Sequence, residues 1–133
     1  MILHVQLKKD CVVLGQLDLC AVLLMKDANY PWLILVPQRE NISEIYQLSE
    51  VDQQQLMRES SQVSRALVAC FHADKINVAA LGNMVPQLHI HHVVRYKQDI
   101  AWPAPVWGFA PSKDYHPVEL EERVMLLRGA LGL

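Results

Sequence analysis

The chain has 133 residues, of which 52% are hydrophobic, and its 12 basic and 14 acidic side chains give a formal net charge of -2. This length suits one domain and is too short for two of ordinary size, so we expect a single domain over residues 1–133. The apolar content excludes a disordered chain, and the near-neutral charge excludes a protein that wraps nucleic acid.

The chain shows no pattern that directs a protein to a membrane or out of the cell. Its longest uninterrupted apolar run, 19–25, is far shorter than the ~20 residues of a membrane-spanning helix. Charged residues interrupt 1–10, so no secretory signal is expected there. Cys11, Cys20 and Cys70 are odd in number and form no CxxC pair, which predicts reduced thiols. We therefore expect a soluble, cytoplasmic protein.

The first third of the chain predicts three short strands. Apolar runs at 12–14 and 17–25 flank Gly15-Gln16, which predicts a hairpin turn between two strands. A third apolar run, Trp32–Val36, follows a polar turn and stops at Pro37, which has no backbone N–H to donate. The close succession of the three runs favours an antiparallel meander.

The spacing of the hydrophobic residues then changes to that of a helix. Ser49, with an acidic residue at Asp52, is typical of a helix start. Hydrophobic residues recur at helical spacing at Leu56, Val63, Leu67, Cys70 and Phe71. They predict an amphipathic helix of about six turns with one buried stripe. The polar positions between them are expected to be solvated, namely Gln53, Gln54, Arg58, Glu59, Gln62 and Arg65.

Two more strands and a second helix are expected in the rest of the chain. The runs 76–81 and 88–94 are short and rich in Val, Ile and Leu. Residues 101–108 hold too many prolines for a strand or a helix. Pro117 suits the first position of a terminal helix over 118–127. The order of strands, long helix and strands favours an α+β fold in which helices cover a sheet.

Half of the six histidines lie within 87–95. Because side chains alternate along a strand, Gln87, His89 and His91 share one face, with neighbours ~6.5–7 Å apart. The alternate residues Leu88, Ile90, His92 and Val94 mark the other face as the buried one. The polar row is therefore expected to face solvent or a site. We expect His92, on the opposite face, to pack against the core or a helix.

Three interpretations of this row remain open from the residues alone. An imidazole can attack a phosphate ester and, when protonated, act as an acid near pH 7. An HxH pair on a strand can also chelate a metal ion. The third ligand would then come from His4, His72, His116 or Asp99, none of which has motif spacing to the pair. The third interpretation is a chance cluster of solvated rings, and the isolated histidines are expected at the surface.

The same segment resembles the histidine triad (HIT) superfamily, whose signature is His-φ-His-φ-His-φ-φ with φ apolar. Here Gln87 stands in the first triad position, and His89 and His91 follow in the second and third. Arg95, eight residues after Gln87, matches an Arg of many members. Residues 33–39 resemble the family's strand that ends in Val/Ile-Pro and a basic residue. The combination is similar to small bacterial HIT-like proteins with Gln in the first position.

This resemblance implies an α+β HIT-like fold, with an antiparallel sheet of about five strands and a long helix and a C-terminal helix packed on it. It also implies a homodimer in which two sheets join, an arrangement that protects an exposed sheet edge. The implied activity is that of a hydrolase or nucleotidyl transferase acting on a nucleotide conjugate, namely a phosphoramidate, an adenylate or a dinucleotide. The expected ligand is a purine nucleotide, and no metal or other cofactor is required.

The resemblance assigns the catalytic positions to His89, His91 and Gln87. His89 would be the nucleophile that takes the nucleotidyl group, and His91 would contact a phosphate oxygen or aid the leaving group. Gln87 can donate and accept hydrogen bonds at similar reach but cannot titrate. Turnover could therefore persist, change its pH dependence, or be lost while binding is retained. A nucleotide-binding module without turnover is the first alternative function, and a metal protein built on the two histidines is the second.

Five further residues match positions that bind the nucleotide in relatives. Asn77, Asn83 and Met84 lie upstream of the triad where phosphate is contacted, and Met84 would offer only its backbone N–H. Arg95 would approach a phosphate, or else form a salt bridge at the end of the strand. Asp27 would bind a ribose hydroxyl, or else be a surface residue of a polar turn. Trp102 and Trp107 are expected to line a base pocket, to form a dimer contact or to cover the core.

Overall fold

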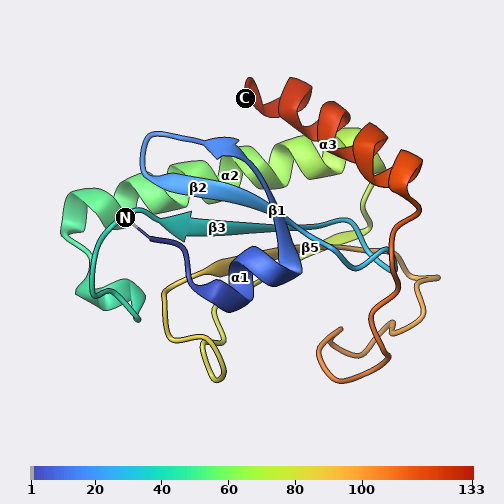
Figure 1. The fold of residues 1–133 in the computed structure, drawn as a ribbon, viewed down its shortest axis with the longest axis horizontal. Helices are drawn as coiled ribbons and strands as arrows, with labels where there is room; N and C mark the ends of the chain where they lie inside the picture. Colours follow the sequence, from blue (N-terminus) through green and yellow to red (C-terminus); the bar gives the residue numbers. More distant parts are fainter. Residues whose placement is uncertain (1) are drawn as a thin grey trace.

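The computed structural model describes residues 2–133 and consists of one antiparallel sheet with helices on it (Figure 1). The strands are β1 Cys11–Gln16, β2 Cys20–Met25, β3 Trp32–Pro37, β4 Lys75–Ala79 and β5 Ile90–Arg95. The helices are α1 Val5–Asp10, the short 3-10 helix η1 Ile45–Gln47, α2 Glu50–Phe71 and α3 Pro117–Leu131. The predicted α+β fold, with five strands, a long helix and a C-terminal helix, is confirmed.

The strand order, β1-β2-β3-β5-β4, makes the histidine-bearing strand an inner strand of the sheet. The first three strands form the predicted meander, and β5 enters between β3 and β4. In the register of β3 and β5, Ile34 lies opposite His91 and Leu33 lies opposite His92. Since adjacent residues point to opposite faces, these two histidines lie on different sides of the sheet.

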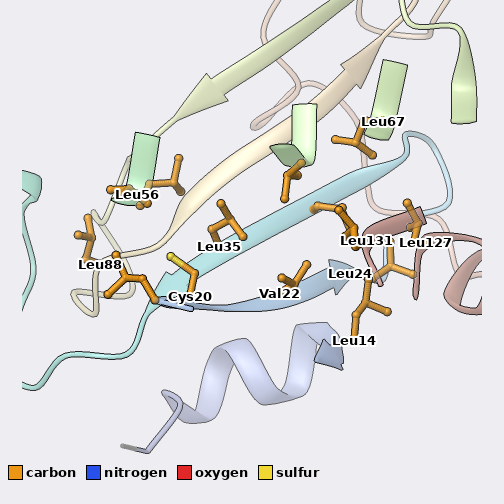
Figure 2. Close-up of a cluster of buried hydrophobic side chains, with 14 of the residues drawn as sticks. Leu14, Cys20, Val22, Leu24, Leu35, Leu56, Leu67, Leu88, Leu127 and Leu131 are labelled. Atoms are coloured by element: carbon orange, nitrogen blue, oxygen red, sulfur yellow. The ribbon is translucent and has the colours of Figure 1, made fainter. Parts of the chain in front are cut away.

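Both faces of the sheet are covered, whereas the sequence predicted only one buried face. On one face, Leu35 and Val94 belong to an apolar cluster with residues of α2 and α3 (Figure 2). On the other face, Ile34 and Val93 belong to a second cluster that includes Leu7 of α1. Every residue of β3 and β5 is buried. His89 and His91 are buried as well, whereas Gln87 is half-buried. Strands that are covered on both faces do not reveal this through alternation.

The helices begin and end at residues with capping chemistry. Ser49 caps α2 by accepting a hydrogen bond from the Asp52 N–H, as its sequence pattern predicts. His116 caps α3, and His4 caps α1, each by accepting a backbone N–H two residues later. His72 ends α2 in the left-handed conformation. Helix α1 was not predicted, because it has only six residues and a single buried side chain.

Two local predictions were wrong. Gly15 and Gln16 lie within β1, and the chain reverses after them; the β1–β2 pairing shifts its register between Val13 and Gly15. Glycine at this place accommodates a bulge rather than a turn. Glu59, expected on the solvated face of α2, is only 2% exposed. Its carboxylate accepts hydrogen bonds from the backbone N–H groups of Leu19 and Cys20 at 2.8 and 2.9 Å, which fastens α2 to the β1–β2 turn.

The three cysteines form no disulfide, as predicted. Cys11, Cys20 and Cys70 are free thiols, and burial raises the pKa of Cys11 to about 12. Burial also raises the pKa of Cys20. Within residues 2–133, no helix has the length and apolar character needed to cross a membrane.

Candidate active site

The polar row lies at the start of β5 and is compact. The strand begins at Ile90, so Gln87 and His89 belong to the segment that leads into it, and His91 lies on the strand itself. The rings of His89 and His91 are 4.9 Å apart between centroids at an angle of 70°. They are 7% and 5% exposed. The two imidazoles are thus brought together as predicted, under a covering layer of side chains.

A hydrogen bond sets the tautomer of His89. Its Nδ1 lies 2.7 Å from the backbone carbonyl oxygen of Gln87. A carbonyl oxygen only accepts, so Nδ1 must carry the proton and donate it. The neutral ring then has its lone pair on Nε2. This is the form of imidazole that can attack an electrophilic phosphorus.

His91 has the opposite tautomer. The indole Nε1–H of Trp32 donates a hydrogen bond of 3.0 Å to Nδ1 of His91. Nδ1 is therefore the acceptor, and the proton of the neutral ring is on Nε2. Burial, followed by the nearby His89 and His92, lowers the pKa of His91 to about 3. The ring is neutral at pH 7 and carries an N–H donor on Nε2, in a ring that lies 4.9 Å from that of His89 between centroids.

His92 lies on the other face of the sheet, as predicted. It is fully buried, and its Nε2 lies 2.7 Å from the hydroxyl oxygen of Ser60 in α2. Its Nδ1 donates to the carbonyl oxygen of Ile90 at 3.1 Å. Burial lowers the pKa of this ring to about 4, although the hydrogen bond to Ile90 opposes the shift. His92 is a packed, helix-facing residue.

The side chain of Gln87 turns towards the N-terminal segment. Its Oε1 accepts from the backbone N–H of His4 at 2.7 Å, and its Nε2 donates to the carbonyl oxygen of Ile2 at 3.2 Å. The carboxamide thus pairs with an extended backbone as another peptide group would. Gln87 reaches His89 through its main-chain carbonyl, not through the amide that the sequence analysis considered.

A pocket of about 660 Å³ adjoins the histidine pair through two tryptophans. Trp32 and Trp107 both line it, and their ring centroids lie 5.6 and 5.2 Å from that of His91. Asp27 also lines it and is buried, so its interpretation as a surface turn residue was wrong. Asp27 Oδ1 accepts from the backbone N–H groups of Asn29 and Lys113. The other lining residues are Lys9, Asp10, Met25, Lys26, Val106, Gly108, Ala110, Ser112, Asp114, Tyr115 and Leu120.

Arg95 and Asn77 form a separate internal cluster. The guanidinium of Arg95 donates two hydrogen bonds to Asp99, one to Asn77 and one to the carbonyl oxygen of Ala104. It also lies 5.6 Å from the ring centroid of Trp102. The salt-bridge alternative for Arg95 therefore describes the structure, and the Oδ1 atom of Asn77 is used by Arg95. Trp102 covers this ion pair.

The two remaining predicted residues lie in the exposed loop between β4 and β5. Asn83 is exposed, and Met84 is 90% exposed. Within the described part of the chain, neither side chain forms a hydrogen bond with His89 or His91. The structure thus brings His89 and His91 together, places the pocket next to the two tryptophans that contact His91, and leaves Asn83 and Met84 at the surface.

The metal interpretation finds little support in the side chains. Among residues 2–133, no group of three or more His, Cys, Asp or Glu side chains could hold a metal ion. Of the third ligands considered, His4 and His116 use their Nδ1 atoms as helix caps, and Asp99 pairs with Arg95. Nδ1 of His91 is also occupied, by Trp32.

Sequence reasoning missed Trp32, which contacts both His91 and the pocket. Trp32 and His91 are 59 positions apart and meet only because β3 pairs with β5. The available signal was the indole N–H itself. A tryptophan at the start of a predicted buried strand needs an acceptor for its N–H, and a histidine on a neighbouring strand can provide one.

The comparisons with known proteins agree with the fold. The family described as HIT domain matches residues 6–98. A crystal structure of a histidine triad protein from Bradyrhizobium japonicum is 49% identical, with a TM-score of 0.95 over 98% of this chain and 97% of that chain. One from Marinobacter aquaeolei is also 49% identical, with a TM-score of 0.95 over 98% of this chain and 96% of that chain. A histidine triad protein from Sinorhizobium meliloti is 40% identical, with a TM-score of 0.94 over 98% of this chain and 96% of that chain. No protein in the search of curated proteins matches the chain.

Proposed function

Because the chain belongs to the HIT domain family, we propose that it is a nucleotide hydrolase or nucleotidyl transferase in which His89 carries the nucleotide. The observation that carries this proposal is the hydrogen bond from Nδ1 of His89 to the Gln87 carbonyl oxygen. It leaves Nε2 as the free lone pair of a neutral ring, the requirement for nucleophilic attack at neutral pH.

The reaction has two steps at one phosphorus. Nε2 of His89 attacks the α-phosphorus of a nucleotide conjugate, and an N–P bond forms as the bond to the leaving group breaks. The leaving group departs with the electron pair and is protonated. Water then attacks the same phosphorus, a proton is released, and the products are a nucleoside monophosphate and free His89. In a transferase, another nucleophile replaces water.

His91 is the proposed stabiliser of the phosphoryl charge. Its Nε2–H can donate to a non-bridging phosphate oxygen while the neighbouring Nε2 of His89 bonds to phosphorus. Burial keeps His91 neutral throughout the neutral pH range, so the hydrogen bond from Trp32 to Nδ1 decides that the single proton of the ring is on Nε2.

We place the nucleoside in the pocket of about 660 Å³. Trp107 offers an aromatic surface to a purine, and Asp27 lies where its carboxylate can accept from a ribose hydroxyl. Trp107 also packs against His91 and thereby joins the pocket to the histidine pair. The residue belongs to the irregular segment after β5, which can adjust without disrupting the sheet.

A nucleotide-binding module without turnover is the second candidate function. The specific observation in its favour is that the Gln87 carboxamide is engaged by Ile2 and His4, so the first triad position supplies no titrating group to the site. Calorimetry with AMP, GMP and dinucleotides would detect binding, and a hydrolysis assay on the same samples would separate the two functions.

We also propose that the protein works as a cytoplasmic homodimer. Among residues 2–133, strand β4 pairs only with β5 and leaves its other edge open, and Val78 in this strand is exposed. An open edge of this kind can pair with a second copy and extend the sheet. Sedimentation at several protein concentrations would test it, and a monomer at all concentrations would exclude it.

Rapid-quench labelling tests the catalytic proposal. A conjugate radiolabelled at the α-phosphate should leave acid-labile, base-stable label on the wild-type protein and none on His89→Ala. His72→Asn serves as the matched control, because His72 is exposed at the end of α2 and Asn tolerates its left-handed backbone. Equal labelling of His89→Ala and the wild type would exclude His89 as the nucleophile.

A further inference from the structure

We propose that Trp32 is a positioning residue for phosphoryl transfer: its indole N–H holds His91 in the tautomer that presents Nε2–H to the phosphate. The proposal rests on the proposed function, because it assigns His91 the role of a donor beside the nucleophilic His89. It adds a residue from a different strand, and it explains why the two site histidines have opposite tautomers.

The contact between the two side chains is direct and protected from water. Trp32 Nε1 lies 3.0 Å from Nδ1 of His91, and both residues are buried. Trp32 pairs with Val93 while Ile34 pairs with His91, so Trp32 reaches His91 diagonally across the β3–β5 ladder. An indole N–H can only donate, and a nitrogen that accepts it carries no proton.

Neighbouring rings hold the indole in this orientation. Tyr30 contacts Trp32 edge-to-face at 6.3 Å between centroids, and Trp107 does so at 5.8 Å. Rotation of the indole away from His91 would break both contacts. It would also leave a buried N–H without an acceptor, which is costly. The donor is therefore in place before any ligand arrives.

The consequence is a matched pair of nitrogens. His89 presents a lone pair on Nε2 because its Nδ1–H is held by the Gln87 carbonyl oxygen. His91 presents a proton on Nε2 because Trp32 occupies its Nδ1. Without the indole N–H, the proton of His91 is free to move to Nδ1, and Nε2 would then repel a phosphate oxygen instead of binding it.

The test combines Trp32→Phe with the matched control Tyr30→Phe. Each variant keeps an aromatic ring at its position, but only the first removes the donor to Nδ1 of His91; Tyr30→Phe keeps the ring that packs edge-to-face on the indole. Long-range ¹H–¹⁵N correlation spectra report which ring nitrogen carries the proton. We expect the Nε2–H form of His91 in the wild type and in Tyr30→Phe, and a shift towards the Nδ1–H form in Trp32→Phe.

The kinetic expectation for Trp32→Phe is a kcat about fivefold to tenfold lower, the effect of about one hydrogen bond, measured by single-turnover release of nucleoside monophosphate. An unchanged kcat together with a changed tautomer would overturn the positioning role. The spectrum of the wild type is a test by itself. If it shows the Nδ1–H form of His91, the proposal is overturned even if Trp32→Phe fails to fold. Absence of turnover in the wild type with the Nε2–H form present would refute the proposed function but not the tautomer assignment.

Discussion

Replacing Asp99 by Asn tests the ion pair that organises the segment after β5. Arg95 Nε lies 2.8 Å from Asp99 Oδ2, and the two side chains are 2% and 5% exposed. The backbone N–H groups of Tyr96, Ala101 and Trp102 also donate to Asp99. Asparagine keeps the shape of the side chain but removes its charge and turns one acceptor into a donor.

The expected loss follows from the titration of Asp99. Burial alone would raise its pKa, but the hydrogen bonds from Arg95 and the backbone outweigh burial and lower the pKa from 3.8 to about 2. This shift corresponds to about 2 kcal/mol of stability. Removing the charge also leaves Arg95 buried without its partner. We expect the free energy of unfolding at pH 7 to fall by about 3 kcal/mol.

The pH dependence has a defined sign. Because the pKa of Asp99 is lower in the folded protein, its stabilising effect is complete above about pH 4 and is lost as the pH falls through about 2. Urea unfolding should therefore show a difference between the wild type and Asp99→Asn that shrinks by about 2 kcal/mol from pH 5 to pH 2.

The control is Asp52→Asn, which breaks the surface pair of Arg39 and Asp52, whose side chains are 47% and 17% exposed. This change should cost about 1 kcal/mol or less. Equal losses for the two variants, or a pH-independent difference for Asp99→Asn, would refute the reasoning.

Three more predictions concern single contacts. Glu59→Gln should lower the free energy of unfolding by about 2 kcal/mol, because the new amide group directs a donor at the backbone N–H of Leu19 or Cys20. A loss below about 0.5 kcal/mol in urea unfolding would contradict this. Tyr30→Phe should be neutral or stabilising, because the buried Tyr30 hydroxyl has no hydrogen-bond partner within residues 2–133. Tyr96→Phe should instead cost about 1 kcal/mol, because it removes the hydrogen bond to the Phe71 carbonyl oxygen. Thermal denaturation of both variants tests this, and equal losses of stability would contradict it. Gln87→Ala should speed hydrogen exchange at the His4 amide, and unchanged exchange there would show that the carboxamide does not hold the N-terminal segment.

Local signals were sufficient for the secondary structure that begins and ends at capping residues. Ser49 and Pro117 marked the starts of the two long helices correctly, because capping depends on residues within one turn. The predicted end of the last helix, 127, fell short of Leu131, since the final turn has no stop signal before Gly132. The five strands were also found, with small shifts at their ends.

The burial of two acidic side chains depends on contacts between distant segments, which the local sequence pattern could not predict. Glu59 is buried because the β1–β2 turn, about 40 positions earlier in the chain, directs two N–H groups at it. Nothing in the spacing of α2 distinguishes this glutamate from its solvated neighbours. Asp27 is buried for a similar reason, since the backbone of Lys113 closes over it.

For the site, the sequence by itself determined that His89 and His91 would lie side by side, because alternation along an extended segment is a local property. The tautomer of His89 depends on a carbonyl oxygen two residues away, which is also a local contact. The tautomer of His91 depends on Trp32, which reaches it across a strand pairing and is 59 positions away in the chain. A ring nitrogen takes or gives a proton according to the group that faces it, and for His91 only the tertiary structure supplies that group.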